Sequence, residues 1–366
     1  MKRRRKSPLV DALFKLGRSA TRTATRAAKT ATRKTTSATT KAISRQASKA
    51  AQQTRDALSG IASPAKAPAT RKGSGRWLEG RWGLGPMAMR RYRLYLPPGA
   101  GRRRPAPLLL FLHGCQQDTA SFAASTRIAS FARSKGLAVL MPEQAQEANP
   151  QRCWNWFGNE HLVALEARIL MSIVDHVGNT EPVKADTVFA MGLSAGGAMS
   201  MTLALRYPDR FRAVASHSGA VASSARNLLQ AGQAMRGRRA PDVDVIYRQL
   251  AGHTAPPLLL IHGDRDPVVN PGSAEAAAAL WLALCDEDDV IRALPPRESA
   301  RGERYPTARF DWKRNGQPYL RMVQVRGLGH AWSGGTAKRM YSDPKGPDAL
   351  RLAWGWFGLQ MRQPGP

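Results

Sequence analysis

The sequence VFAMGLSAGGAM, at residues 188–199, is the segment that determines the architecture of this chain. Its first four residues are apolar and have the length of a buried strand, whereas the residues after Ser194 are typical of a helix. Between them lies a G-x-S-x-G motif, in which Gly192 and Gly196 leave room for a sharp strand-to-helix turn. Such a turn raises the Ser194 hydroxyl above the sheet, at the positive end of the helix.

The same alternation of strand and helix extends in both directions along the chain. Short apolar runs alternate with segments whose apolar residues recur at helical spacing. The strands are predicted at residues 92–96, 108–112, 137–141, 188–191, 211–216, 258–261 and 322–325, and the helices at residues 162–177, 195–206, 274–284 and 348–357. This alternation is typical of a mostly parallel sheet covered on both faces, so the predicted fold class is α/β.

Composition separates a basic N-terminal tail from one larger domain. The chain has 366 residues and a formal net charge of +30. Residues 1–76 hold 20 Lys and Arg against two acidic residues, whereas residues 77–366 hold 36 against 24. The tail is low in complexity, rich in Ala, Thr, Lys and Arg, and ends in a linker. It has too few large apolar residues to fold alone, so we expect it to be disordered or helical on binding.

Three interpretations of the tail stay open. It is a solvated extension, or it binds nucleic acid through counterion release, or it contacts another acidic surface such as a membrane or a storage granule. In the last case Leu9, Leu13 and Leu16 would form an apolar edge. No apolar run in the chain approaches the roughly 18 residues of a membrane span, which excludes an integral membrane protein built from such helices.

Ser194 requires a base, and the base requires an acid that orients it. In the arrangement that G-x-S-x-G introduces, the acid and then the histidine follow the serine along the chain. Asp266 closes an H-G-x-x-D segment after the strand at residues 258–261, and His330 follows the last predicted strand between small residues. We predict Ser194 as nucleophile, Asp266 as acid and His330 as general base. Asp264 is the second candidate for the acid, although its spacing favours a role in turning the loop.

The negative oxygen of an acyl-transfer transition state requires hydrogen-bond donors. We predict two backbone amides, that of Ala195 after the nucleophile and that of Cys115 in the H-G-C segment after the strand at residues 108–112. His217 and His262, at other strand ends, are expected to be ordinary hydrogen-bonded histidines. The chemistry is ester hydrolysis through an acyl-enzyme, and it needs no metal and no organic cofactor.

Further motifs carry a resemblance that extends from about Met89 to Phe357. They are LHGCQQ at residues 112–117, CWNWF at 153–157, GLSAGGAM at 192–199, HG at 262–263 with Asp266, and GHAWSGG at 329–335. In these segments the sequence resembles the polyhydroxybutyrate (PHB) depolymerase-type esterases, catalytic domain type 1, of the α/β-hydrolase superfamily. The resemblance implies hydroxyalkanoate oligomers or polyester as substrate. Feruloyl and acetylxylan esterases are similar in the same segments, so their esters are the alternative substrates.

The resemblance also implies roles for residues outside the Ser-Asp-His set. Cys115 and Cys153 match two cysteine positions, which implies one disulfide, while two reduced buried thiols remain the alternative for a cytosolic protein. Trp154, Trp156 and Trp332 would line an apolar cleft for the acyl group, or belong to the core. The resemblance leaves the oligomeric state open.

The N-terminus predicts where the protein resides. Its first residues, MKRRRK, are basic like the start of a signal peptide, but no apolar segment of sufficient length follows them. A cytoplasmic or granule-associated protein is therefore expected. Secretion is the alternative, because members of the resembled family are mostly extracellular.

Overall fold

A large sheet forms the centre of the fold, with the strand order β1-β2-β4-β3-β5-β6-β7-β11-β10-β8 and with β9 paired to β10. The structure is a computed structural model that describes residues 73–83, 85 and 88–363. The strands of the sheet are β1 (Arg76–Trp82), β2 (Arg90–Leu96), β3 (Ala106–Leu112), β4 (Ala138–Glu143), β5 (Val183–Leu193), β6 (Phe211–His217), β7 (Leu258–Gly263), β8 (Ile291–Ala293), β9 (Arg297–Ser299), β10 (Thr307–Arg314) and β11 (Gln317–Val325). The predictions made for residues 1–72, including the tail helix and its binding, lie outside the described residues.

The middle of the sheet is parallel and its edges are antiparallel. Strands β4, β3, β5, β6, β7 and β11 run parallel to their neighbours in this row. At one edge β2 pairs antiparallel with β4 and β1, and at the other β10 pairs antiparallel with β11, β8 and β9. A separate pair joins β12 (Trp332–Ser333) to β13 (Ser342–Asp343).

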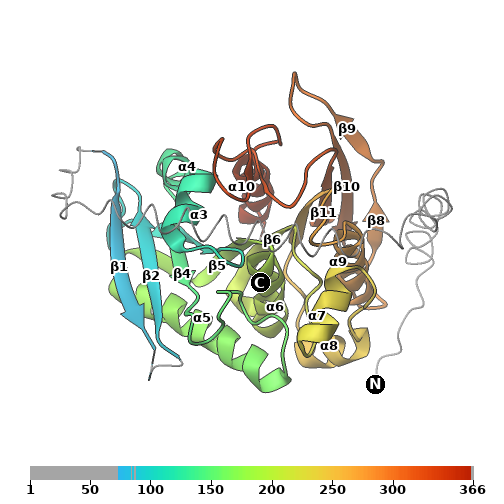
Figure 1. The fold of residues 1–366 in the computed structure, drawn as a ribbon, viewed down its shortest axis with the longest axis horizontal. Coiled ribbons are helices and arrows are strands. Elements are labelled where there is room, and N and C mark those ends of the chain that lie inside the picture. Colours follow the sequence, from blue (N-terminus) through green and yellow to red (C-terminus); the bar gives the residue numbers. More distant parts are fainter. Residues whose placement is uncertain (1–72, 84, 86–87, 364–366) are drawn as a thin grey trace, which may run out of the picture. The chain divides into compact units, whose positions relative to one another are not determined.

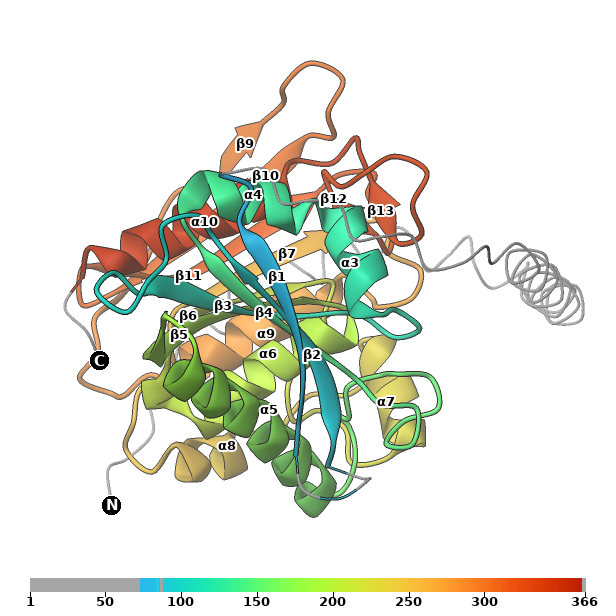
Figure 2. The same ribbon diagram turned by 90° about the vertical axis from the view of Figure 1, so that its left-hand side faces the viewer.

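Helices cover both faces of the sheet. In Figure 1, α3, α4 and α10 lie on one side of the strands, and α5, α6 and α9 lie on the other. Figure 2 shows β1 and β2 crossing in front of the remaining strands. The helices are α3 (Thr119–Thr126), α4 (Ile128–Lys135), α5 (Glu160–Thr180), α6 (Ala195–Arg206), α7 (Leu228–Met235), α8 (Val243–Leu250), α9 (Gly272–Ala283) and α10 (Ala349–Met361), with a short 3-10 helix at Pro208–Arg210. None of the described helices is long and apolar enough to cross a membrane.

The continuous apolar runs become the central strands because both of their faces are buried. Leu110, Phe111 and Leu112 of β3 are all 0% exposed, as the double cover of helices requires. Every strand and helix predicted within residues 92–357 is present, with ends that differ by a few residues. The α/β fold class is therefore confirmed, and its arrangement is that of an α/β-hydrolase.

The register of the parallel strands brings their carboxyl ends to one edge of the sheet. Leu112 pairs with Gly192, Leu193 with His217, and Gly263 with Val325. The segments that follow β3, β5, β7 and β11 therefore begin at the same edge. In open α/β sheets, ligands bind outside this edge.

Candidate active site

The turn between β5 and α6 has the backbone geometry that its glycines permit. Ser194 has φ 55° and ψ −118°, a conformation that few non-glycine residues adopt. A Cβ atom on Gly192 would lie 2.3 Å from the Gly196 carbonyl carbon, and one on Gly196 would lie 2.2 Å from the Leu112 carbonyl oxygen. The Ser194 amide donates to the His217 carbonyl over 2.8 Å, which fixes the turn against β6.

Ser194, His330 and Asp266 form a continuous chain of hydrogen bonds. His330 Nε2 lies 3.0 Å from Ser194 Oγ, and His330 Nδ1 lies 2.7 Å from Asp266 Oδ2. An ionised carboxylate only accepts hydrogen bonds, so Nδ1–H donates to Asp266 and Nε2 is left to accept from the serine hydroxyl. The structure thus brings together three residues that lie far apart in the sequence.

Asp266 is buried and held as a carboxylate. Its Oδ1 accepts hydrogen bonds from the amides of Val268 and Val269, each over 2.9 Å, and His262 Nε2 lies 3.4 Å from its Oδ2. Burial would by itself raise the pKa of Asp266. The hydrogen bonds from His262 and His330 outweigh that cost and hold the pKa well below its ordinary value of 3.8.

Asp264, the second candidate for the acid, stabilises the segment after β7 instead of contacting His330. Its Oδ1 accepts a hydrogen bond from the Gly327 amide over 2.6 Å. This bond joins the segment after β7 to the segment after β11, on which His330 lies. Asp264 therefore contributes to the placement of His330 without contacting the imidazole.

His217 supports the same site through a buried, neutral imidazole. Its Nε2 accepts a hydrogen bond from the Ser333 amide over 3.1 Å, so its Nδ1–H is the donor toward Ser218 Oγ, also at 3.1 Å. Burial, and after it the nearby His262 and His330, together lower the pKa of His217 to about 3. His217 is thus a hydrogen-bonded histidine, as expected, although its contact with the segment that follows His330 was not predicted.

The segment after β3 lies directly against the serine. A Cβ atom on Gly114 would be 3.5 Å from Ser194 Cβ, and Gln117 Oε1 accepts from the Gly114 amide over 2.8 Å, which folds the segment. Among the described residues, the amides of Cys115 and Ala195 donate to no acceptor. Both amides therefore remain available to an oxygen atom bound beside Ser194.

A disulfide joins Cys115 to Cys153. It connects the segment after β3 to the CWNWF segment that the resemblance singled out. Cys285 is the free cysteine among the described residues.

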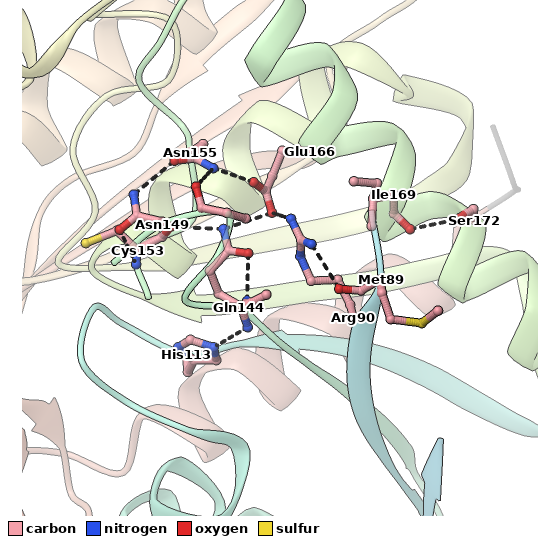
Figure 3. A network of polar contacts seen from close by, with 12 residues as sticks. Met89, Arg90, His113, Gln144, Asn149, Cys153, Asn155, Glu166, Ile169 and Ser172 are labelled. Carbon is pink, nitrogen blue, oxygen red and sulfur yellow. Dashed lines mark hydrogen bonds and ion pairs between the residues drawn. The ribbon is translucent and has the colours of Figure 1, made fainter. Parts of the chain in front are cut away.

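The network in Figure 3 joins the segment after β3, which begins at His113, to the segment around Cys153. Trp154 Nε1 donates to the His113 carbonyl over 3.0 Å, and the Gln144 amide donates to His113 Nε2 over 3.1 Å. His113 Nδ1–H is consequently the donor to the Gly114 carbonyl, at 2.7 Å. Burial lowers the pKa of His113, which keeps the imidazole neutral in this arrangement. The Gln144 side chain in turn donates to the Cys153 carbonyl over 3.0 Å.

Glu166 on α5 lies at the centre of that network. Its Oε1 accepts from Gln144 Nε2 over 3.0 Å, and its Oε2 accepts from Asn155 Nδ2 over 2.7 Å. The Arg90 guanidinium lies 3.4 Å from Oε1, and both side chains of this ion pair are 2% exposed. Glu166 and Arg90 were not predicted, because nothing in their local sequence distinguishes them from surface charges on a helix and a strand.

The three tryptophans, for which the sequence left a cleft and the core open, lie in the interior. Trp154 is 0%, Trp156 4% and Trp332 1% exposed. Trp154 is held by its hydrogen bond to His113, and Trp332 packs edge-on against Phe111 with 5.4 Å between ring centroids. Their rings therefore support the segments around Ser194 from within the core.

Comparison with known proteins points to one family. The model of a family described as "Esterase PHB depolymerase" matches residues 90–301. The poly(3-hydroxyalkanoate) depolymerase C of Paucimonas lemoignei is 26% identical over 63% of this chain and 56% of its own length. The feruloyl esterase B of Thermothelomyces thermophilus is 27% identical over 48% of this chain and 64% of its own length. The chain thus spans less than two thirds of each of these two relatives.

Solved structures support the fold. An acetyl xylan esterase from Aspergillus awamori superposes with a TM-score of 0.56 and 15% sequence identity, over 78% of this chain and all of that one. At this identity the likeness concerns the fold alone. It agrees with the α/β-hydrolase arrangement of the sheet and its helices.

Proposed function

Because the chain belongs to the esterase PHB depolymerase family, we propose that it hydrolyses carboxylic esters with Ser194 as the nucleophile. One observation carries the proposal, namely the chain of hydrogen bonds from Ser194 Oγ through His330 to Asp266. Beside this chain lie the backbone amides of Cys115 and Ala195, which donate to no acceptor among the described residues. A serine hydroxyl is a weak nucleophile unless a base removes its proton. The chain of contacts supplies the base and the carboxylate that orients it.

The first half of the reaction forms an acyl-enzyme. Ser194 Oγ attacks the ester carbonyl carbon while His330 Nε2 takes the hydroxyl proton. The negative charge on the carbonyl oxygen is held by the amides of Cys115 and Ala195. The tetrahedral intermediate then collapses, the carbon–oxygen bond to the alcohol breaks, and His330 gives its proton to the leaving alcohol.

The second half releases the acid. A water molecule gives a proton to His330 Nε2 and attacks the acyl carbon, and the same two amides hold the oxygen charge. The bond to Ser194 Oγ breaks, and His330 returns its proton to the serine. Asp266 keeps the imidazole in the required tautomer throughout, since its carboxylate accepts from Nδ1–H.

For the substrate we propose hydroxyalkanoate oligomers or polyester of the PHB type. The family match and the name of the Paucimonas lemoignei relative support this class. Feruloyl esters are the second candidate, because two of the relatives are named feruloyl esterase B.

A panel of three esters tests the proposal: p-nitrophenyl butyrate, a hydroxybutyrate trimer and methyl ferulate. The wild-type chain is compared with Ser194→Ala and with Ser223→Ala, an exposed serine whose φ of 58° resembles that of Ser194. We expect fastest turnover of the trimer, loss of all turnover in Ser194→Ala, and wild-type rates in Ser223→Ala. Full turnover in Ser194→Ala would refute the nucleophile, and faster turnover of methyl ferulate would transfer the substrate to feruloyl esters.

For residues 1–76 we propose contact with an acidic surface, which their 20 basic and two acidic residues support. Residues 77–366 would then be the esterase domain. The disulfide between Cys115 and Cys153 supports export rather than a cytoplasmic location, because such bonds persist in oxidising compartments. Thiol titration of the unfolded chain, taken directly from its cells, checks this: one free thiol is expected for an exported protein and three for a cytoplasmic one.

A further inference from the structure

A basic hollow of about 730 Å³ is lined by residues of α10, the α3–α4 junction and the strands β9 and β10. In both views the turn between β9 and β10 extends away from the sheet (Figures 1 and 2). Six arginines line this arginine hollow, namely Arg127, Arg297, Arg301, Arg304, Arg309 and Arg351. Neither Ser194 nor His330 lines it, so the proposed ester hydrolysis does not account for it.

The charge of the arginine hollow is not balanced by the carboxylates around it. Its lining contains two acidic residues, Glu298 and Asp348, against six guanidinium groups. Glu298 pairs with Arg326, which lies outside the lining. Asp348 is 3.6 Å from Arg351 and 4.0 Å from Arg127, so one carboxylate serves two guanidinium groups. The lining therefore carries a net charge of four positive units.

Three of the guanidinium groups have no acidic partner among the described residues. Arg309 lies 2.8 Å from Asp311, but Arg297, Arg301 and Arg304 make no ion pair with any residue that the structure describes. All three are exposed and lie on β9 or in the turn that follows it. Like charges that line one hollow repel one another, and a bound anion would relieve the repulsion.

The floor of the hollow is apolar. Val323 of β11 and Leu352 of α10 line it together with the ring of Tyr305. The volume of the hollow lies within the roughly 300–1,000 Å³ of small-molecule sites.

The chemistry of the lining selects the class of ligand. Guanidinium groups present paired donors that match phosphate oxygens in a bidentate manner. Each phosphate monoester carries about −1.5 to −2 charges near neutral pH, so two or three phosphates balance the four positive units of the lining. A monocarboxylate, such as a single hydroxy acid, would leave most of that charge uncompensated.

We propose that the arginine hollow is a binding site for a ligand that carries two or more phosphate groups, either a free oligophosphate or a phosphorylated lipid headgroup. The site is separate from Ser194, and it does not depend on ester hydrolysis. Arg297, Arg301 and Arg304 supply the guanidinium groups that the ligand engages. Arg127 and Arg351 bound the opposite side of the hollow.

Titration calorimetry with inorganic tripolyphosphate tests the site on the full chain, at an ionic strength of about 0.15 M, where charges beyond about 8 Å are screened. The test variant is Arg297→Gln/Arg301→Gln/Arg304→Gln. The matched control is Arg102→Gln/Arg103→Gln/Arg104→Gln, which removes the same number of exposed arginines before β3 and leaves the hollow intact. Both variants keep the basic N-terminal residues, so the tail contributes equally to each.

We expect Kd for tripolyphosphate to rise at least about tenfold in the test variant, since each lost charged contact is worth about that factor, and to change less than about twofold in the control. A second titration uses phosphatidylcholine vesicles that contain a phosphatidylinositol bisphosphate. If the test variant loses binding to these vesicles, the phosphates come from a lipid headgroup. If it loses binding to tripolyphosphate alone, the ligand is a free oligophosphate. Equal loss in both variants, or no saturable binding of either probe, would overturn the proposal.

Discussion

Replacing Glu166 by alanine removes the acceptor on which the buried network beneath the segment after β3 depends. The carboxylate is 2% exposed and neutralises the equally buried Arg90 guanidinium. It also accepts from Gln144 and Asn155, the residues that hold the segment around Cys153. Glu166→Ala therefore leaves a buried charge without its carboxylate and removes one acceptor from each of the Gln144 and Asn155 side-chain amides.

The magnitude follows from that burial. Breaking a buried ion pair by removing one partner costs about 3–5 kcal/mol, which is a large part of the roughly 5–15 kcal/mol that stabilises a typical domain. The matched control is Glu160→Ala at the start of the same helix. Glu160 is 73% exposed, and loss of its pair with Arg206 should cost at most about 1 kcal/mol.

Urea unfolding measures both variants, with the free energy taken from the midpoint and slope of the transition. We expect Glu166→Ala to lose at least about 2 kcal/mol more than Glu160→Ala. The double variant Arg90→Met/Glu166→Met should recover part of that loss, since no buried charge remains. Equal losses in the two alanine variants would refute the role assigned to the network.

Three further perturbations test the site. Gly196→Ala places a methyl group 2.2 Å from the Leu112 carbonyl oxygen and should lower the free energy of unfolding in urea by about 1–3 kcal/mol. The control is Gly355→Ala on α10, where a Cβ meets nothing within 4 Å, and it should raise that free energy by about 0.5–1 kcal/mol. A destabilised Gly355→Ala or a neutral Gly196→Ala contradicts the packing. The pKa of His217 in the folded state is about 3, below its ordinary 6.5, so its contribution to the free energy of unfolding is complete above pH 6.5. That contribution is lost as the pH falls toward 3, by up to about 1.4 kcal/mol per pH unit. His217→Asn should therefore make the free energy of unfolding depend less on pH in this range, and an unchanged dependence would show that His217 titrates normally. Asp266→Asn should lower kcat for p-nitrophenyl butyrate by roughly 10⁴-fold. It should also remove the stability that the ionised carboxylate contributes above pH 3.8 and loses in stronger acid. A variant with near wild-type kcat and an unchanged loss of stability in acid argues against Asp266.

The sequence was most informative where local physics alone determines the structure. The turn at Ser194 needs small neighbours on both sides, and Gly192 and Gly196 mark it in any context. The central strands were equally predictable, because double burial requires continuous apolar runs such as that of β3. The edge strands β1 and β10 alternate apolar with charged residues and carry no such run, so they were missed.

The burial and the partners of a side chain were harder to predict, because they depend on residues that lie far away in the sequence. Tryptophans near motif residues suit a substrate cleft and a core equally well, and the packing of Trp332 on Phe111 places it in the core. Glu166 resembles a surface charge until Arg90, 76 residues earlier, is placed beside it. The arginine hollow likewise combines residues from α10, the α3–α4 junction and β9, which no sequence window contains together.

Covalent labelling provides the sharpest test of the nucleophile. The full chain is incubated with a fluorophosphonate, which transfers its phosphonyl group to an activated serine oxygen with loss of fluoride, and the modified peptide is identified by mass spectrometry. The account predicts one adduct per chain, on Ser194, with loss of p-nitrophenyl butyrate hydrolysis in proportion to labelling. An adduct on another residue, or undiminished hydrolysis by fully labelled protein, would contradict it.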